Sequence, residues 1–284
     1  MKISTHIPPF ARAVLAATPF LLSSVMAQST APATAPLGST FYNWDTLIVT
    51  PTKSGARRAV IDSPTLSFAR LTMHITTLNP GAILQPPGHH AQEEVIWVRE
   101  GNLELWLNGK TQNAGPGALI FLAAHALHNL KNIGDKPATY YVIDVYTAAT
   151  AIVRDQPADE WAPAGVLKST VFDCNNLPSK PTPKGFSCPV VTSPTATLVE
   201  LHSHLTTLNP GMTTGMLADP ADEIIIITAG LVESNIKGIT CRLAAGSFYF
   251  QAANDLHSMT NVGPTPTTYQ VLKFVSETIP KPAH

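Results

Sequence analysis

A short stretch of this chain occurs twice, at an offset of 130 residues. Ile75-Thr-Thr-Leu-Asn-Pro-Gly81 returns as Leu205-Thr-Thr-Leu-Asn-Pro-Gly211. After a one-residue deletion the offset becomes 129, and it relates further pairs of identical residues. These pairs are Glu94 and Glu223, Gly101 and Gly230, Gly117 and Gly246, His128 and His257, Asn132 and Asn261, Gly134 and Gly263, and Pro137 and Pro266. Because one register persists along the sequence, we interpret the chain as two copies of one unit, each large enough to be a domain.

Each copy has the pattern of short β-strands joined by turns. Residues 71–78 and 103–107 alternate between apolar and polar side chains, and Asn108-Gly109 is typical of a type I′ hairpin turn. Further strands are expected at 118–122, 139–145, 224–228 and 247–251. No segment shows a long 3.6-residue period. Together with 25 prolines, this pattern favours an all-β fold, either a sandwich or a barrel.

The N-terminus has the features of a secretory signal. Lys2 and Arg12 supply positive charge, an apolar run follows at 13–26, and Val-Met-Ala at 25–27 offers a cleavage site. We therefore expect a signal peptide at 1–27 and a periplasmic or secreted protein. The alternative is a disordered apolar tail. The run is too short to be a good transmembrane span.

The charge balance argues against two classes of partner. The formal net charge is −1, and 13% of residues are charged. Such a surface has no electrostatic attraction for nucleic acid or for an anionic membrane. No other stretch is long and apolar enough to span a bilayer. The expected partner is therefore a small-molecule ligand or substrate, with no membrane contact after signal cleavage.

These observations divide the chain into segments. We expect a signal peptide at 1–27, a disordered leader at 28–40, an N-terminal domain at 41–149, a proline-rich linker and docking segment at 150–190, and a C-terminal domain at 191–278. Part of the linker should supply the first strand of the second domain. An exported protein can form disulfides, so Cys174 and Cys188 are either bridged or two free thiols.

A set of spaced residues in the first copy resembles the motifs of the cupin superfamily. The matching positions are Gly81, His90, Glu94, Gly101, Gly117, His128 and Asn132. The resemblance implies two tandem double-stranded β-helix barrels of the jelly-roll, RmlC-like kind, that is, a bicupin. In general build the chain is loosely similar to the (S)-ureidoglycine aminohydrolase-like bicupins. Because cupin barrels commonly pair, a homo-oligomer is also expected.

The resemblance further implies a metal site in the first barrel. The candidate ligands are His89, His90, Glu94 and His128, which suit a divalent transition metal such as Mn, Fe, Zn, Ni or Cu. Cupin sites usually take a first ligand two residues before His90, and Gly88 occupies that position. Side chains alternate along a strand, so His89 should point away from His90 and Glu94 unless a bulge turns it inward. By the same parity, Glu93 should face solvent.

The second copy departs further from the motif. Leu217 and Asp219 stand where two histidines are expected, followed by Glu223 and His257. This set favours a structural barrel or ligand pocket over a metal site. His74, in contrast, recurs as His204. We take His74 as the candidate catalytic residue, able to bind substrate or move a proton near neutral pH. The alternative is a solvent-facing histidine.

The fold alone fixes no reaction, because cupin barrels serve many chemistries. Our leading hypothesis is a metal-dependent enzyme that acts on a small polar or carboxylate-containing molecule in the N-terminal barrel, as a hydrolase, decarboxylase or dioxygenase. The alternative is an exported, non-catalytic bicupin that binds a small molecule or a metal. A storage-type structural protein is a third possibility. Whether the chain is an enzyme is left open by the sequence.

Overall fold

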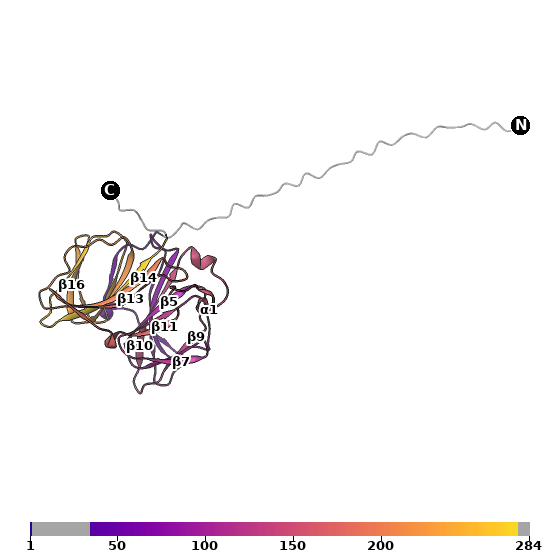
Figure 1. Cartoon of the computed structure of the whole chain (residues 1–284), viewed down its shortest axis with the longest axis horizontal. Coiled ribbons are helices and arrows are strands. Elements are labelled where there is room, and N and C mark those ends of the chain that lie inside the picture. The colour runs from indigo at the N-terminus through magenta and orange to yellow at the C-terminus, as the bar shows by residue number, and fades with distance from the viewer. Residues whose placement is uncertain (2–34, 278–284) are drawn as a thin grey trace. The chain divides into compact units, whose positions relative to one another are not determined.

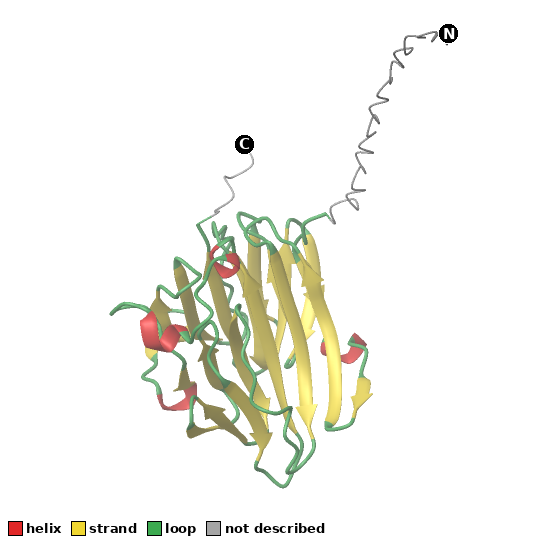
Figure 2. Ribbon diagram, turned by 90° about the vertical axis from the view of Figure 1, so that its right-hand side faces the viewer, coloured by secondary structure: helices red, strands yellow, loops and turns green. Residues whose placement is uncertain are grey.

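The computed structural model describes Met1 and residues 35–277. Apart from Met1, the expected signal peptide lies outside the described residues, as does the expected leader up to residue 34. The described chain is almost entirely β-structure, with short helices only at the margins (Figure 2). This confirms the all-β prediction. The helices are η1 (Trp44–Thr46), η2 (Ala149–Ala151), α1 (Ala158–Trp161) and η3 (Cys174–Asn176).

The two sequence repeats correspond to two matching sets of ten strands. The first set is β1 (Thr40–Tyr42), β2 (Thr50–Thr52), β3 (Gly55–Ser63), β4 (Arg70–Leu78), β5 (Glu93–Glu100), β6 (Leu103–Leu107), β7 (Lys110–Ala114), β8 (Ala118–Leu122), β9 (His128–Asn132) and β10 (Ala138–Tyr146). The second set is β11 (Thr170–Asp173), β12 (Lys180–Thr182), β13 (Gly185–Ser193), β14 (Glu200–Leu208), β15 (Asp222–Ala229), β16 (Leu231–Ile236), β17 (Ile239–Ala244), β18 (Phe248–Gln251), β19 (His257–Asn261) and β20 (Thr267–Val275). The duplication therefore begins earlier than the matching residues suggest.

Each copy forms a jelly-roll barrel from one large and one small antiparallel sheet. In the first barrel the strand orders are β11-β8-β5-β10-β4-β3-β2 and β7-β6-β9. In the second they are β1-β18-β15-β20-β14-β13-β12 and β17-β16-β19. In Figure 1 the strands of the large sheets lie centrally, with β16 to one side and β7 and β9 to the other. The two tandem barrels agree with the expected architecture.

The two barrels exchange their edge strands. Thr40 of β1 pairs with Phe250 of the second barrel, and Thr170 of β11 pairs with Phe121 of the first. Each exchange covers the unpaired edge of a large sheet, which would otherwise offer open backbone groups. The linker does contribute to the second barrel as expected, through β12, but its β11 joins the first. The domain boundaries at 149 and 191 stay a prediction.

Strand parity separates the barrel interior from the interface between barrels. In the first barrel, even-numbered residues such as Ile96 and Val142 share a core with Leu105 of the small sheet. Odd-numbered residues such as Val95 and Ile143 share a different core with the second barrel's residues. That second group includes Ile224, Phe248, Leu272 and Phe274. The large sheets therefore pack face to face, and the even-numbered side chains are left to line the first barrel.

Glu93 corrects one sequence prediction. Its side chain does point away from Glu94, but the second barrel covers that face, and Glu93 is only 2% exposed. Its carboxylate accepts hydrogen bonds from Ala196 N at 2.9 Å and from Thr197 Oγ1 at 2.7 Å. A third bond comes from Thr195 Oγ1. The prediction of a solvent-facing Glu93 is wrong. The alternation of side chains predicts the face of the sheet on which Glu93 lies, but it cannot predict that the second barrel covers that face.

The second barrel likewise uses a buried carboxylate to bond a turn of the first copy. Asp222, the repeat equivalent of Glu93, accepts a hydrogen bond from Thr65 Oγ1 of the first copy at 2.7 Å and one from Ala253 N at 2.8 Å. Each barrel therefore uses one buried carboxylate to hold a threonine-containing turn of the other. Such charge-assisted bonds are stronger than neutral ones and fix the register of the interface.

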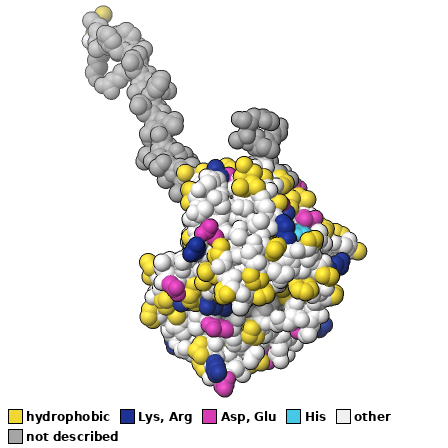
Figure 3. Space-filling view, turned by 90° about the vertical axis from the view of Figure 1, so that its left-hand side faces the viewer, with side chains coloured by type: hydrophobic (Ala, Val, Ile, Leu, Met, Phe, Trp, Pro, Cys, Tyr) yellow, Lys and Arg dark blue, Asp and Glu magenta, His cyan; other side chains and the backbone are white. Residues whose placement is uncertain are grey.

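Cys174, Cys188 and Cys241 are all free thiols, the first two of them buried. The helices found in residues 35–277 are all too short or too polar for a bilayer crossing. On the face drawn in Figure 3, acidic and basic side chains are scattered among apolar ones, without a large patch of one sign.

Candidate metal centre

Three donor side chains meet inside the first barrel. Glu94 is the second residue of β5, His128 opens β9, and His90 lies in the segment that leads into β5. That segment is held against β9 by two backbone bonds: Gly88 N donates to His128 O at 3.1 Å, and His128 N donates to Gly88 O at 3.0 Å. This bridge brings His90 beside His128, although 37 residues separate them in sequence.

The donor atoms lie within reach of one small ion. His90 Nε2 is 3.4 Å from Glu94 Oε2, and His128 Nε2 is 4.0 Å from Glu94 Oε1. The two imidazole centroids are 5.3 Å apart. One ligand atom from each of the three residues falls within 4.8 Å of the others. The structure thus brings together three of the four side chains that the sequence nominated.

Both imidazoles are oriented by the backbone. His90 Nδ1 lies 2.9 Å from Gln92 O, and His128 Nδ1 lies 2.8 Å from Ala126 O. A carbonyl oxygen only accepts, so each Nδ1 carries a proton and each Nε2 is directed toward Glu94, where it can bind a cation once it has lost its own proton. Metal-binding histidines are held in this way in proteins, by a hydrogen bond on the nitrogen that does not ligate. The donor set therefore fits a divalent transition metal.

The opposite charges of Glu94 and the two imidazoles stabilise one another and shift the pKa values of His90 and Glu94. Burial acts to raise the pKa of Glu94, but the hydrogen bond from His90 and the charges of His128 and His90 outweigh it and leave the pKa lowered. Burial acts to lower the pKa of His90, but the hydrogen bond and charge of Glu94 leave it raised. Glu94 is thus held as a carboxylate, the form that can bind a cation.

Asp144 adds a second carboxylate that the sequence reasoning missed. It lies directly across from Glu94 in the register of β10 and β5. Its Oδ2 accepts a 2.6 Å hydrogen bond from Thr72 Oγ1, while its buried Oδ1 has no hydrogen-bond partner among the described residues. Burial and then the charge of Glu94 raise the pKa of Asp144 to about 7. The available signal was an aspartate inside an otherwise apolar strand.

His89 does not join the cluster. It is exposed, and its Nδ1 lies 3.2 Å from His125 Nδ1 instead. The alternation of side chains along an extended segment sends it to the opposite side from His90. The expectation that His89 completes the first ligand set is corrected accordingly. No bulge turns it inward, and position 88 offers only a glycine.

His74 lines the same barrel. It sits at an even position of β4, opposite Val142, and borders a cavity of about 250 Å³ together with Arg57, Thr72 and Asp144. It is half-buried rather than freely exposed. Burial, reinforced by the positive charge of Arg57, lowers the pKa of His74 to about 4. The histidine is therefore neutral at neutral pH.

The second barrel carries a fixed cation at the equivalent place. Lys273 Nζ bonds Asp219 and lies 3.5 Å from Glu223 Oε1. Burial raises the pKa of Glu223 to about 7 despite the lysine. In residues 35–277, both groups of three potential metal-ligating side chains lie between positions 89 and 155, outside the second barrel. The second barrel instead has a cavity of about 210 Å³ bordered by His204, Tyr249 and His257.

Sequence comparison identifies part of the first barrel. The family described as "Cupin domain" matches residues 74–145, which span β4 to β10 and contain His90, Glu94 and His128. No curated protein matches the sequence.

Comparison of the whole fold extends the likeness to both barrels. The protein Ylba from E. coli superimposes with a TM-score of 0.63 at 13% identity, over 84% of this chain and 90% of that one. The oxalate decarboxylase of Lactobacillus farciminis, in its formate complex, gives 0.63 at 13% identity, over 86% and 88%. AerE from Microcystis aeruginosa gives 0.62 at 13%, over 83% and 99%. At these identities the likeness establishes the fold alone.

Proposed function

We propose that the first barrel, whose residues 74–145 match the cupin domain in a chain with the two-barrel fold of bicupins, is a metal-dependent enzyme site for a small carboxylate-containing molecule. The observation that carries the proposal is the convergence of His90 Nε2, His128 Nε2 and a Glu94 oxygen within 4.8 Å. Three protein donors leave room for further ligands, which is what catalytic sites need and structural sites lack. The metal, when bound, would supply Lewis acidity toward an oxygen of the substrate.

The cavity bordered by His74 and Asp144 has a feature suited to an anion. Arg57 borders it and carries a positive charge that is not neutralised by an ion pair among the described contacts. Arg57 can bind a carboxylate in a bidentate manner, which would orient the substrate toward Glu94 and Asp144. Decarboxylation of a small carboxylate is the reaction we favour, and the fold shared with oxalate decarboxylases supports this choice.

His74 is proposed as the residue that moves a proton. It is neutral at neutral pH, so it can accept a hydrogen bond or a proton from a substrate held by Arg57. Thr72 Oγ1 donates to Oδ2 of Asp144, and the buried Oδ1 of this cavity-lining residue can hold a proton for the same reaction.

The test combines metal content with turnover. The purified full chain is loaded in turn with Mn²⁺, Fe²⁺, Ni²⁺, Cu²⁺ and Zn²⁺ and offered small mono- and dicarboxylates, with release of CO₂, uptake of O₂ and release of ammonia followed separately. We expect CO₂ release that is lost in Glu94→Gln and His128→Gln. His257→Gln, the matched change in the second barrel, should keep activity. A protein whose turnover survives Glu94→Gln would contradict the proposal.

A non-catalytic binder is the second candidate. The glycine at position 88 leaves the site with three donors, and Lys273 occupies the equivalent place in the second barrel, so among the described residues only one barrel offers an interior metal centre. On this alternative, the protein would bind metal or a carboxylate tightly but release no product with any of the metals tested.

Export is a separate proposal that depends on the motif at 1–27. Expression with the complete N-terminus, followed by fractionation and N-terminal sequencing, should give a mature chain that begins at Gln28 outside the cytoplasm. An intact N-terminus in the cytoplasmic fraction would contradict export.

A further inference from the structure

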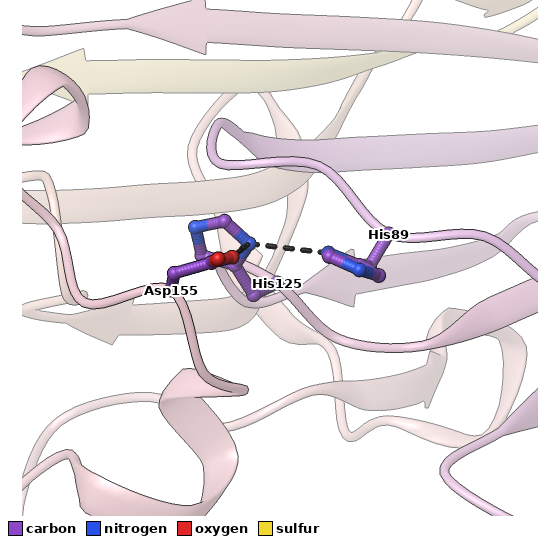
Figure 4. Close-up of side chains that lie close together, drawn as sticks. All are labelled: His89, His125 and Asp155. Atoms are coloured by element: carbon purple, nitrogen blue, oxygen red, sulfur yellow. Dashed lines mark hydrogen bonds and ion pairs between the residues drawn. The ribbon is translucent and has the colours of Figure 1, made fainter.

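A second group of potential ligands lies outside the site described above. His89, His125 and Asp155 come from three separate loops and converge on one point, as Figure 4 shows. His89 Nδ1 and His125 Nδ1 are 3.2 Å apart, and His125 Nδ1 is 3.3 Å from Asp155 Oδ1. The side chain of His125 is 10% exposed, whereas that of Asp155 is 88% exposed.

A single nitrogen has to serve two neighbours in this group. His125 Nδ1 faces an imidazole nitrogen on one side and a carboxylate oxygen on the other, and it carries at most one proton. If that proton points to Asp155 Oδ1, His89 Nδ1 receives no full hydrogen bond from His125. If His125 Nδ1 instead accepts a hydrogen bond from His89, it has no proton to donate to Asp155. A cation placed between the three atoms removes the conflict, because all three can then act as electron-pair donors.

The spacing matches that of a bound ion. A tetrahedral zinc ion with bonds of about 2.0–2.1 Å has ligand–ligand edges of about 3.4 Å. The contacts from His125 to His89 and to Asp155, at 3.2 and 3.3 Å, are both close to that edge. All three ligand atoms lie within 4.8 Å of one another. Because the Asp155 side chain is exposed, it can move so that the distance between its carboxylate and His89 also reaches this value.

The second copy supplies an internal comparison. At the positions equivalent to His89 and His125 it has Ala218 and Asn254. His125 and Asn254 share the same left-handed backbone, with φ of 58° and 66°. Asparagine adopts that conformation readily, so the fold itself has no need for a histidine there. The pair of imidazoles is therefore an addition of the first copy to a turn that both copies build.

We propose that His89, His125 and Asp155 form a second binding site, for a borderline divalent transition metal such as Zn²⁺. Two imidazoles and one carboxylate suit that class of ion. The site opens to solvent at Asp155, so water completes the coordination. A bound ion would tie the segment between η2 and α1 to the loop that carries His90. The proposal does not depend on the function proposed for the first site.

The experiment measures Zn²⁺ bound to the full chain by equilibrium dialysis with elemental analysis, together with the visible absorption of the Co²⁺-loaded protein. We expect two equivalents in the wild type and one in His125→Asn, a substitution that installs the residue used by the second copy. Glu94→Gln should also leave one equivalent, and the double variant none. His202→Asn, a histidine outside both groups, should keep two.

The outcomes separate the two proposals. Loss of an ion in His125→Asn but not in Glu94→Gln would support the second site and count against the first. If the wild type binds a single equivalent that His125→Asn retains, the second site is overturned. An unchanged Tm of metal-free His125→Asn confirms that the variant folds, and His89→Ala provides an independent variant with the same expected loss.

Discussion

Lys273 in the second barrel occupies the position that Asp144 holds in the first. Each lies directly opposite a glutamate of the neighbouring strand: Asp144 opposite Glu94, and Lys273 opposite Glu223. The charge at this position is therefore inverted between the copies. In the first barrel two carboxylates and two imidazoles form a group that can bind a cation. In the second barrel the ammonium group of Lys273 is itself the cation.

Removal of that internal cation should destabilise the second barrel. In Lys273→Met, Asp219 and Glu223 lose their partner, and we expect the free energy of unfolding to fall by about 2 kcal/mol, less than for a fully buried pair because Lys273 is 22% exposed. The measurement is chemical denaturation. Lys237→Met, which breaks a pair with a 64% exposed lysine, should cost less than about 1 kcal/mol. Equal effects of the two changes would contradict the assignment.

Gly88 should accept the missing ligand. A Cβ at this position would meet only Gln85 Nε2 at 3.7 Å and Pro86 O at 3.9 Å, which are ordinary contacts. The side chain would share the face of His90. We expect Gly88→His to tighten metal binding by at least about tenfold, as judged by competition with a chelator, because a fourth protein donor is added. Leu217→His is the matched change in the second barrel and should create no metal site beside Lys273.

The interface carboxylate Glu93 should contribute measurably to stability. Glu93→Gln places an amide group against three donors, so at least one bond is lost and a donor is left facing a donor. We expect a loss of about 2–3 kcal/mol in the free energy of unfolding. Glu160→Gln, an exposed change, should have almost no effect. A Glu93→Gln protein as stable as the control would mean that the interface is not held in this way.

Acid should weaken the fold through two half-buried histidines. The pKa values of His74 and His204 are each lowered to about 4, by burial and by nearby positive charge. A lowered histidine pKa means that the unfolded chain binds protons more readily, so this stability is present above pH 6.5 and is lost as pH falls toward 4. At pH 5 we expect a loss of about 1–2 kcal/mol per histidine.

The double variant His74→Gln, His204→Gln isolates this effect. Its stability should vary less between pH 7 and pH 5 than that of the wild type. Glu223 acts in the opposite sense, because its raised pKa gives a contribution that is lost as pH rises through about 7, but it is present in both proteins and cancels in the comparison. Parallel stability curves for the two proteins would contradict the role assigned to the histidines.

The sequence was sufficient for the barrels and for the core of the site. The repeat register and the alternation of side chains predict two all-β domains, which the resemblance to cupins makes barrels. The same alternation assigns His90 and Glu94 to one face and His89 to the other. These properties are local, so they can be read from spacing. The meeting of His90 with His128 followed from the resemblance to cupins.

Long-range contacts could not be predicted in this way. The burial of Glu93 depends on a turn near Thr195, about a hundred positions away, and the exchange of β1 and β11 depends on how two complete sheets pack. Asp144 was hidden within an apolar strand, where nothing nearby in sequence marks it. Asp155 lies in a loop whose place beside His125 only the fold determines.

The account depends most on the claim that His90, Glu94 and His128 hold one ion. The direct measurement is anomalous diffraction from crystals of the purified full chain loaded with Mn²⁺ or Zn²⁺. We predict an anomalous peak about 2.0–2.3 Å from His90 Nε2, His128 Nε2 and a carboxylate oxygen of Glu94. Crystals that show no peak there at saturating metal, with the three side chains still gathered as described, would contradict the account.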